Sequence, residues 1–154
     1  MATFVSNPVT VTLTTSDEPY RRADLEFHGV DHSKASYEGR LFINNPEAGP
    51  ETPTGDESYA GSFWVFGHGG CAGDEGHCAP PRERRPFDFR PEHQLTPMSK
   101  RVIITEKLEA LVGQGQSFSV RIVPYVRPEN AEPLAANLVT ALLHFDRVDL
   151  LTYQ

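Results

Sequence analysis

Two histidines and two cysteines lie close together in one glycine-rich segment, Gly-His-Gly-Gly-Cys-Ala-Gly-Asp-Glu-Gly-His-Cys. They are His68, Cys71, His77 and Cys78, within eleven positions, and His93 follows further along the chain. Thiolate sulfur and imidazole nitrogen are ligands that zinc and copper prefer. The glycines give the backbone the freedom to fold tightly around an ion. The pattern therefore predicts one soft-ligand site for copper or zinc, with His93 as a substitute ligand.

The same segment also has a structural interpretation. Six residues separate Cys71 from Cys78, whereas a zinc finger uses Cys-x-x-Cys with a pair of histidines on a helix. A Cys71–Cys78 disulfide, or two plain thiols, would then close a glycine loop that carries surface histidines. A redox role for the two cysteines is a third interpretation. A reducing cytosol disfavours the disulfide if the protein stays there, and the alternatives remain open.

Other catalytic signatures are missing or out of place. The stretch 67–72 loosely matches a dinucleotide-binding fingerprint, but that fingerprint needs a helix to open at the loop. Prolines at 80, 81 and 86 prevent a helix there. No Gly-x-Ser-x-Gly elbow or phosphate-binding loop is present. We interpret the remaining histidines as packed or exposed side chains in or beside strands; they are His28, His32 and His144.

The glycine-rich segment follows the most hydrophobic of several predicted strands. Alternation of polar and apolar residues predicts strands over 4–14, 22–27, 36–44, 59–66, 101–104 and 117–125. Gly29 is expected to end the second of these. A short helix is predicted over 105–112, with Thr105 as its N-cap and Gly113 after its end. The stretch 134–145 has helical spacing but β-branched residues, and strand is favoured towards the end of the chain.

These elements predict an all-β fold. We expect a single domain over 1–154, an antiparallel β-sandwich of about seven strands with one long loop rich in glycine and proline and one short helix. The composition agrees, because Gly 12 and Pro 13 imply many turns and few long helices. The predicted core consists of Leu41, Ile43, Phe63, Val65, Val120 and Ile122.

Charge and hydropathy exclude several classes of function. The net charge of -7 disfavours nucleic acid as a partner, because nucleic-acid binders usually carry a basic surplus. No stretch is long and apolar enough to span a bilayer, so no membrane partner is expected. The first residues do not resemble a secretory signal. The cytoplasm is the expected compartment by default, with export in complex with a signal-bearing partner as the alternative.

Several segments resemble one known family. The run Tyr-Ala-Gly-Ser-Phe-Trp-Val-Phe-Gly-His at 59–68 is similar to a strand of the C-terminal domain of plant polyphenol oxidases. The runs 101–111 and 118–124 are similar to the strand, short helix and next strand of that domain. The run 36–46 is similar to a strand in the C-terminal domains of tyrosinase-like proteins and molluscan hemocyanins. Together these segments cover about two-thirds of the chain in a consistent order.

The resemblance implies a β-domain without its catalytic partner. In this family two copper ions are bound by six histidines on a separate helix bundle, which the sequence lacks. The chain is therefore expected not to be an enzyme but an accessory domain that covers, stabilises or assists metal loading of a tyrosinase-like oxidase domain. Some relatives carry cysteines linked to copper delivery, but the Cys71–Cys78 spacing departs from theirs. The alternative is a free-standing interaction or ligand-binding β-sandwich with a structural Cys/His loop.

Overall fold

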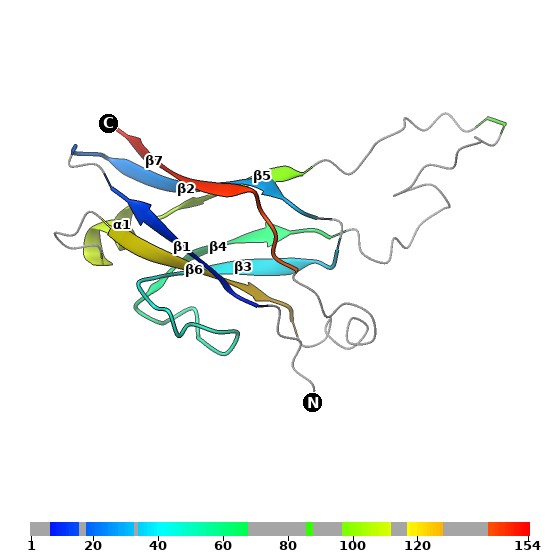
Figure 1. The fold of residues 1–154 in the computed structure, drawn as a ribbon, viewed down its shortest axis with the longest axis horizontal. Helices are drawn as coiled ribbons and strands as arrows, with labels where there is room; N and C mark the ends of the chain where they lie inside the picture. The colour runs from blue at the N-terminus through cyan, green and yellow to red at the C-terminus, as the bar shows by residue number, and fades with distance from the viewer. Residues whose placement is uncertain are drawn as a thin grey trace.

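The structure is a computed structural model that describes residues 7–15, 18–32, 34–67, 86–87, 97–111, 117–127 and 142–154. Within these ranges the chain forms strands and one short helix (Figure 1). In chain order they are β1 (Val9–Thr14), β2 (Arg22–Val30), β3 (Tyr37–Ile43), β4 (Tyr59–Val65), β5 (Met98–Ile103), α1 (Thr105–Leu111), β6 (Ser117–Tyr125) and β7 (Arg147–Tyr153).

The strands form two packed sheets. The first sheet has the order β1-β6-β3-β4 and the second the order β5-β2-β7. Every pair of neighbouring strands is antiparallel. Side chains on the two inner faces alternate with outward-facing residues. β3 is buried on both faces, because Phe42 packs with Ala48 and Val123 in a second, smaller cluster. The predicted all-β sandwich with a short helix is confirmed.

The core lies between the two sheets. All six predicted core residues are buried, and the ring of Phe63 packs on Phe27 with 4.9 Å between their centroids. Phe145, just before β7, closes the same cluster with its ring 5.4 Å from that of Phe27. Alternation in the sequence identified these positions because a half-buried strand directs every second side chain inwards.

Several expected boundaries were wrong: β1 begins at Val9, β3 and β4 differ by one residue at their ends, and β2 and β5 differ more. β2 continues through Gly29 to Val30, because Gly29 adopts a φ of 69° and the register with β5 shifts between Phe27 and Val30. A glycine with positive φ inside a strand marks a bulge and need not end the strand. β5 begins at Met98, three residues before the predicted start.

The helix begins where the sequence predicts it, but Thr105 has a different role. The first helical bond runs from the Leu108 N–H to the Ile104 carbonyl. The Thr105 hydroxyl instead accepts a hydrogen bond from the Ala23 N–H at 2.9 Å, which ties α1 to β2. Of the ambiguous stretch 134–145, only residues 142–145 are described, and they are neither helix nor strand.

Candidate interaction surface

The five predicted metal ligands, His68, Cys71, His77, Cys78 and His93, all lie outside the described residues, so the site remains a prediction. The described part of the chain contains no group of three or more metal-ligating side chains. What is defined is the point from which the glycine-rich segment starts.

That starting point is held by hydrogen bonding between two strands. Gly67 lies two residues after the end of β4, and its N–H donates to the hydroxyl of Ser36, the residue just before β3, at 2.9 Å. The neighbouring strands pair from Tyr37 opposite Val65 onwards. His68 is the next residue in the sequence, so the last described residue before the predicted ligands, Gly67, has a defined position.

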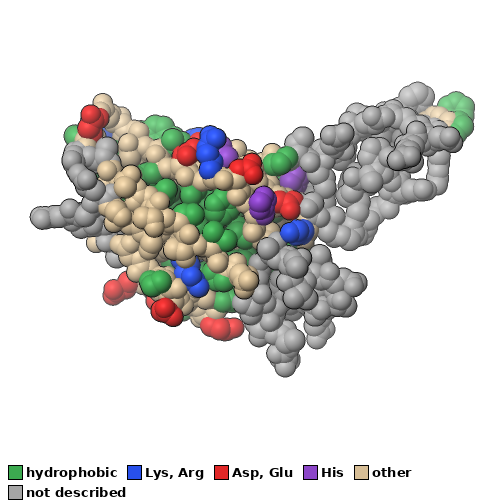
Figure 2. Space-filling view, in the orientation of Figure 1, with side chains coloured by type: hydrophobic (Ala, Val, Ile, Leu, Met, Phe, Trp, Pro, Cys, Tyr) green, Lys and Arg blue, Asp and Glu red, His purple; other side chains and the backbone are tan. Residues whose placement is uncertain are grey.

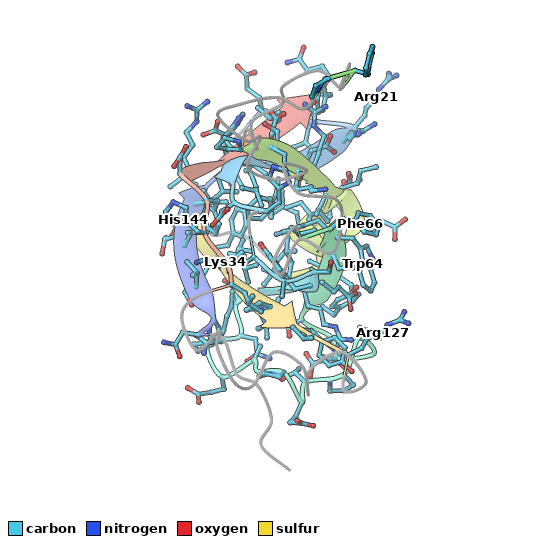
Figure 3. All side chains as sticks on the ribbon, turned by 90° about the vertical axis from the view of Figure 1, so that its right-hand side faces the viewer. Arg21, Lys34, Trp64, Phe66, Arg127 and His144 are labelled. Atoms are coloured by element: carbon cyan, nitrogen blue, oxygen red, sulfur yellow. The ribbon has the colours of Figure 1, made fainter. Side chains whose placement is uncertain are left out.

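Two large aromatic side chains are exposed at the same end of β4. Trp64 keeps 46% of its surface accessible and Phe66 keeps 76%. Figure 3 shows both along one side of the molecule, with Arg127 beyond them and with Lys34 and His144 elsewhere. Contiguous exposed apolar side chains on a soluble protein commonly mark a site of contact with another molecule, whereas single scattered ones do not.

Neighbouring strands extend this exposed pair into a larger surface. Trp64 lies opposite Glu38 on β3, and Glu38 lies opposite Tyr125 on β6, so the three side chains share the outer face of the sheet. The Arg40 guanidinium lies 3.5 Å from the Tyr125 ring centroid, and its Nε donates to Glu38 at 3.0 Å. Arg127 lies 5.7 Å from the Trp64 ring centroid.

We call this the aromatic–arginine surface; it consists of Trp64, Phe66, Tyr125, Arg40 and Arg127. Tryptophan, tyrosine and arginine are the residue types that contribute most to binding free energy at protein interfaces. The cation–π contacts hold two of the guanidinium groups against rings, which reduces the entropy lost when a partner binds. The arrangement therefore suits recognition of a protein better than chemistry on a small substrate.

The outer face of the second sheet has a different character. Its charged side chains form short ion pairs, Arg22–Asp24 at 2.7 Å, Arg101–Glu26 at 3.0 Å and Arg147–Asp149 at 3.0 Å, and the His28 Nε2 atom lies 3.1 Å from Asp149. The hydrogen bond from Arg147 holds the pKa of Asp149 below its ordinary value. Because three arginines balance three carboxylates, of which Asp24 is fully buried, we interpret this face as a charge-balanced polar surface.

A groove lies at the opposite end of the sandwich, beside α1. It has a volume of about 660 Å³, and residues from β2, β4, β5 and α1 line it. Tyr59 and Ile103 provide apolar walls, while Arg21, Lys107 and Glu106 bring charges of both signs. The Lys107 ammonium already donates to the Glu57 carbonyl at 3.1 Å. The groove could accept a small polar ligand, but its charges do not select one class.

Comparison with known proteins supports the fold. A scan of protein families and a search of curated proteins returned no match to this sequence. Among solved structures, the chain matches latent aurone synthase (polyphenol oxidase) from natural source with a TM-score of 0.54 over 97% of this chain. It matches recombinantly expressed latent aurone synthase (polyphenol oxidase) with a TM-score of 0.55 over the same share.

This chain shares its fold with part of a polyphenol oxidase. The sequence identities are 13% and 12%, and the chain spans about a quarter of the length of those oxidases, 24% and 25%. The expected resemblance is therefore confirmed as a likeness in fold. A match to about a quarter of the oxidase is what a resemblance to its β-domain, without the rest of the protein, predicts.

The aromatic–arginine surface was not identified from the sequence, although a signal for it was present. The run Phe-Trp-Val-Phe at 63–66 is apolar at every position, whereas a strand with one face in water alternates. Phe63 and Val65 fill the inward positions and are buried. Apolar residues at the outward positions, 64 and 66, therefore indicate an exposed aromatic patch, which regular alternation would not produce.

Proposed function

We propose that this chain is a non-catalytic accessory domain that packs against the oxidase domain of a tyrosinase-like type 3 copper protein and covers, stabilises or assists metal loading of that domain. The observation that supports the proposal most is the match to polyphenol oxidase over 97% of this chain but only 24% of the other. In polyphenol oxidase this fold is one part of a larger chain. In the present chain, the described residues include no helix bundle.

The contact is assigned to the aromatic–arginine surface. Trp64 and Phe66 together expose about 250 Å² of aromatic surface, taking roughly 150–250 Å² for a whole aromatic side chain. Burying such anchors at the centre of an interface typically contributes about 2 kcal/mol or more for each residue. This surface lies at the end of β4, and in the sequence the segment with the predicted copper ligands begins with His68, two residues after Phe66.

A direct assay tests the absence of catalysis. The purified protein is incubated with copper and a catechol, and quinone formation is followed against the same concentration of free copper. The proposal expects no turnover above that of free copper. Sustained turnover that is lost on heat denaturation would show that the isolated chain is an enzyme.

Binding is tested with a tyrosinase-like oxidase domain from the same organism, co-expressed with this chain. The two proteins should co-purify, and the oxidase should gain copper or stability in the presence of the partner. Trp64→Ala should weaken the complex at least tenfold, which corresponds to about 1.4 kcal/mol. The matched control is Tyr153→Ala, which removes another exposed aromatic from the opposite sheet. Equal losses in the two variants would exclude this surface.

A ligand-binding sandwich is the second candidate function. The groove beside α1, at about 660 Å³, falls within the range of about 300–1,000 Å³ typical of small-molecule sites. A protein that binds no oxidase but is stabilised by a small ligand, with the effect lost in Arg21→Ala, would favour this function over the accessory role.

A further inference from the structure

The two lateral sides of the sandwich are closed to different extents. On the β4–β5 side the sheets meet tightly, and a Cβ on Gly61 would lie 2.9 Å from the Val102 side chain. Ala60 and Val65 are buried on that side. On the other side, β1 and β7 are the edge strands of their sheets, and they lie close together at one end and diverge towards the other (Figure 1).

This divergence leaves core residues partly uncovered. The inward-facing side chains of the two edge strands pack against the core but are only partly buried; they are Val9, Val11, Leu13, Val148 and Leu150. Their neighbours on the inner strands, such as Val120 and Ile122, are 0% exposed. Figure 2 shows apolar side chains gathered on this face, between the positions that β7 and β1 occupy in Figure 1. We call these five residues the apolar wedge.

Within its own six residues, β1 lacks the charges, prolines and bulges that normally protect an edge strand. Among the described strands β1 pairs with β6 alone. Its sequence is Val-Thr-Val-Thr-Leu-Thr, with no charged residue, proline or glycine. Proteins usually protect exposed edges with lysine, proline or a bulge, because a free row of N–H and C=O groups pairs with other chains. An apolar, uncharged edge beside partly buried core residues is able to accept a further strand.

We propose that the occupant is a second copy of this chain, bound by antiparallel pairing of β1 with the β1 strand of the copy across a twofold axis. The alternation of β1 makes it complementary to itself. With Thr12 opposite Thr12 of the copy, Val11 faces Leu13 and Thr10 faces Thr14, while Val9 at the start of the strand faces Thr15 just beyond its end. Such cross-strand pairs are the stabilising unit of a sheet.

Charge favours this site for contact between copies. Two chains with a net charge of -7 repel each other over most of their surface. A twofold contact brings each side chain near its own equivalent, so any charge in the strand would face a like charge. β1 and the apolar wedge contain no charged side chain. Arg121 donates a hydrogen bond to the Thr10 hydroxyl, but it does so on the outer face of the sheet. Pairing also brings the two wedges towards each other and covers their apolar surface.

The proposal is tested by sedimentation equilibrium of the purified protein over a range of concentrations. We expect a monomer–dimer equilibrium. Thr12→Lys should raise the dimer dissociation constant at least tenfold, because two lysines would then lie opposite each other across the axis. Thr12 is exposed, so the substitution leaves the core intact, which circular dichroism can verify. The matched control is Ser99→Lys, which adds the same charge to the exposed face of another edge strand, β5, and should leave the equilibrium unchanged.

A second variant tests the register. Opposite residues of an antiparallel pair have Cα atoms about 4.5–5.5 Å apart, within the range for a disulfide. Thr12→Cys should therefore form a covalent dimer on mild oxidation, and Ser99→Cys should not. A protein that stays monomeric at every concentration would overturn the proposal. A dimer that Thr12→Lys leaves intact would also overturn it, because the contact would then not involve β1. The accessory role does not depend on either outcome.

Discussion

Replacing Tyr37 by phenylalanine should stabilise the protein. Tyr37 is 2% exposed, its ring packs 6.4 Å from that of Phe63, and no described residue provides a hydrogen-bond partner for its hydroxyl. A buried hydroxyl without a partner costs about 1–3 kcal/mol, whereas the aromatic ring is retained in phenylalanine. The free energy of unfolding of Tyr37→Phe at pH 7 should therefore exceed that of the wild type by about 1 kcal/mol or more.

The advantage of the variant should grow at alkaline pH. Burial, and then the negative charge of Asp31, raise the pKa of Tyr37 well above its ordinary value. In the unfolded chain the phenol ionises near pH 10, while the folded state keeps it protonated. The stability linked to this proton is complete below pH 10 and falls above it, by about 1.4 kcal/mol per pH unit. At pH 11 the difference between variant and wild type should be about 1.4 kcal/mol larger than at pH 7.

Urea unfolding of both proteins at pH 7 and at pH 11 measures both effects. Tyr153→Phe is the control, because its side chain is exposed and its hydroxyl is not buried. If Tyr37→Phe is less stable than the wild type at pH 7, the hydroxyl has a partner. If the difference between the two proteins is the same at both pH values, the link between burial and ionisation is refuted.

Two further predictions concern the backbone and the metal site. Gly61→Ala should lower the free energy of unfolding by about 1–3 kcal/mol, because Gly61 has a φ of 122° and an added Cβ would crowd Val102. The control is Gly55→Ala, where nothing lies within 4 Å of the added Cβ; in the same urea titration it should change the free energy of unfolding by less than about 0.5 kcal/mol. If Cys71 is a ligand, Cys71→Ser should weaken copper or zinc binding to the reduced protein. The affinity of the wild-type protein for the metal should fall as pH drops, because the ligands must be deprotonated. Unchanged binding, or the absence of free thiols, would leave the loop as a disulfide-closed structural element.

The sequence predicted strands well where one face is buried and the other is not. The span 117–125 was predicted with its observed boundaries, because Phe118, Val120 and Ile122 alternate with polar residues and face the core. The prediction failed at Gly29, because the sequence does not distinguish a glycine that ends a strand from one that forms a bulge within it. Here the φ of 69° and the shifted pairing with β5 show that Gly29 forms a bulge.

Surfaces made by several strands could not be derived in the same way. The apolar wedge depends on β1 and β7 being the edges of different sheets, and sheet order follows from long-range pairing that alternation does not encode. The positions of Arg40 and Tyr125 on one face likewise depend on the β3–β6 register. For the predicted ligands the sequence provides the residue types but not their arrangement, because a glycine-rich segment has no periodicity from which to infer one.

The two proposed contacts are compatible because one uses the outer face of the sheet, over β4, β3 and β6, and the other uses the free edge of β1. β1 and β4 are the outer strands of the order β1-β6-β3-β4, so pairing β1 with its copy would give a continuous sheet of eight strands with β4 at both ends. At about 4.8 Å per strand, the two β4 strands would be about 34 Å apart, which leaves both aromatic–arginine surfaces open to a partner. Thr12→Lys should then separate the dimer without weakening the oxidase complex, and Trp64→Ala should have the opposite effect. A variant that abolished both contacts at once would show that they are a single interface.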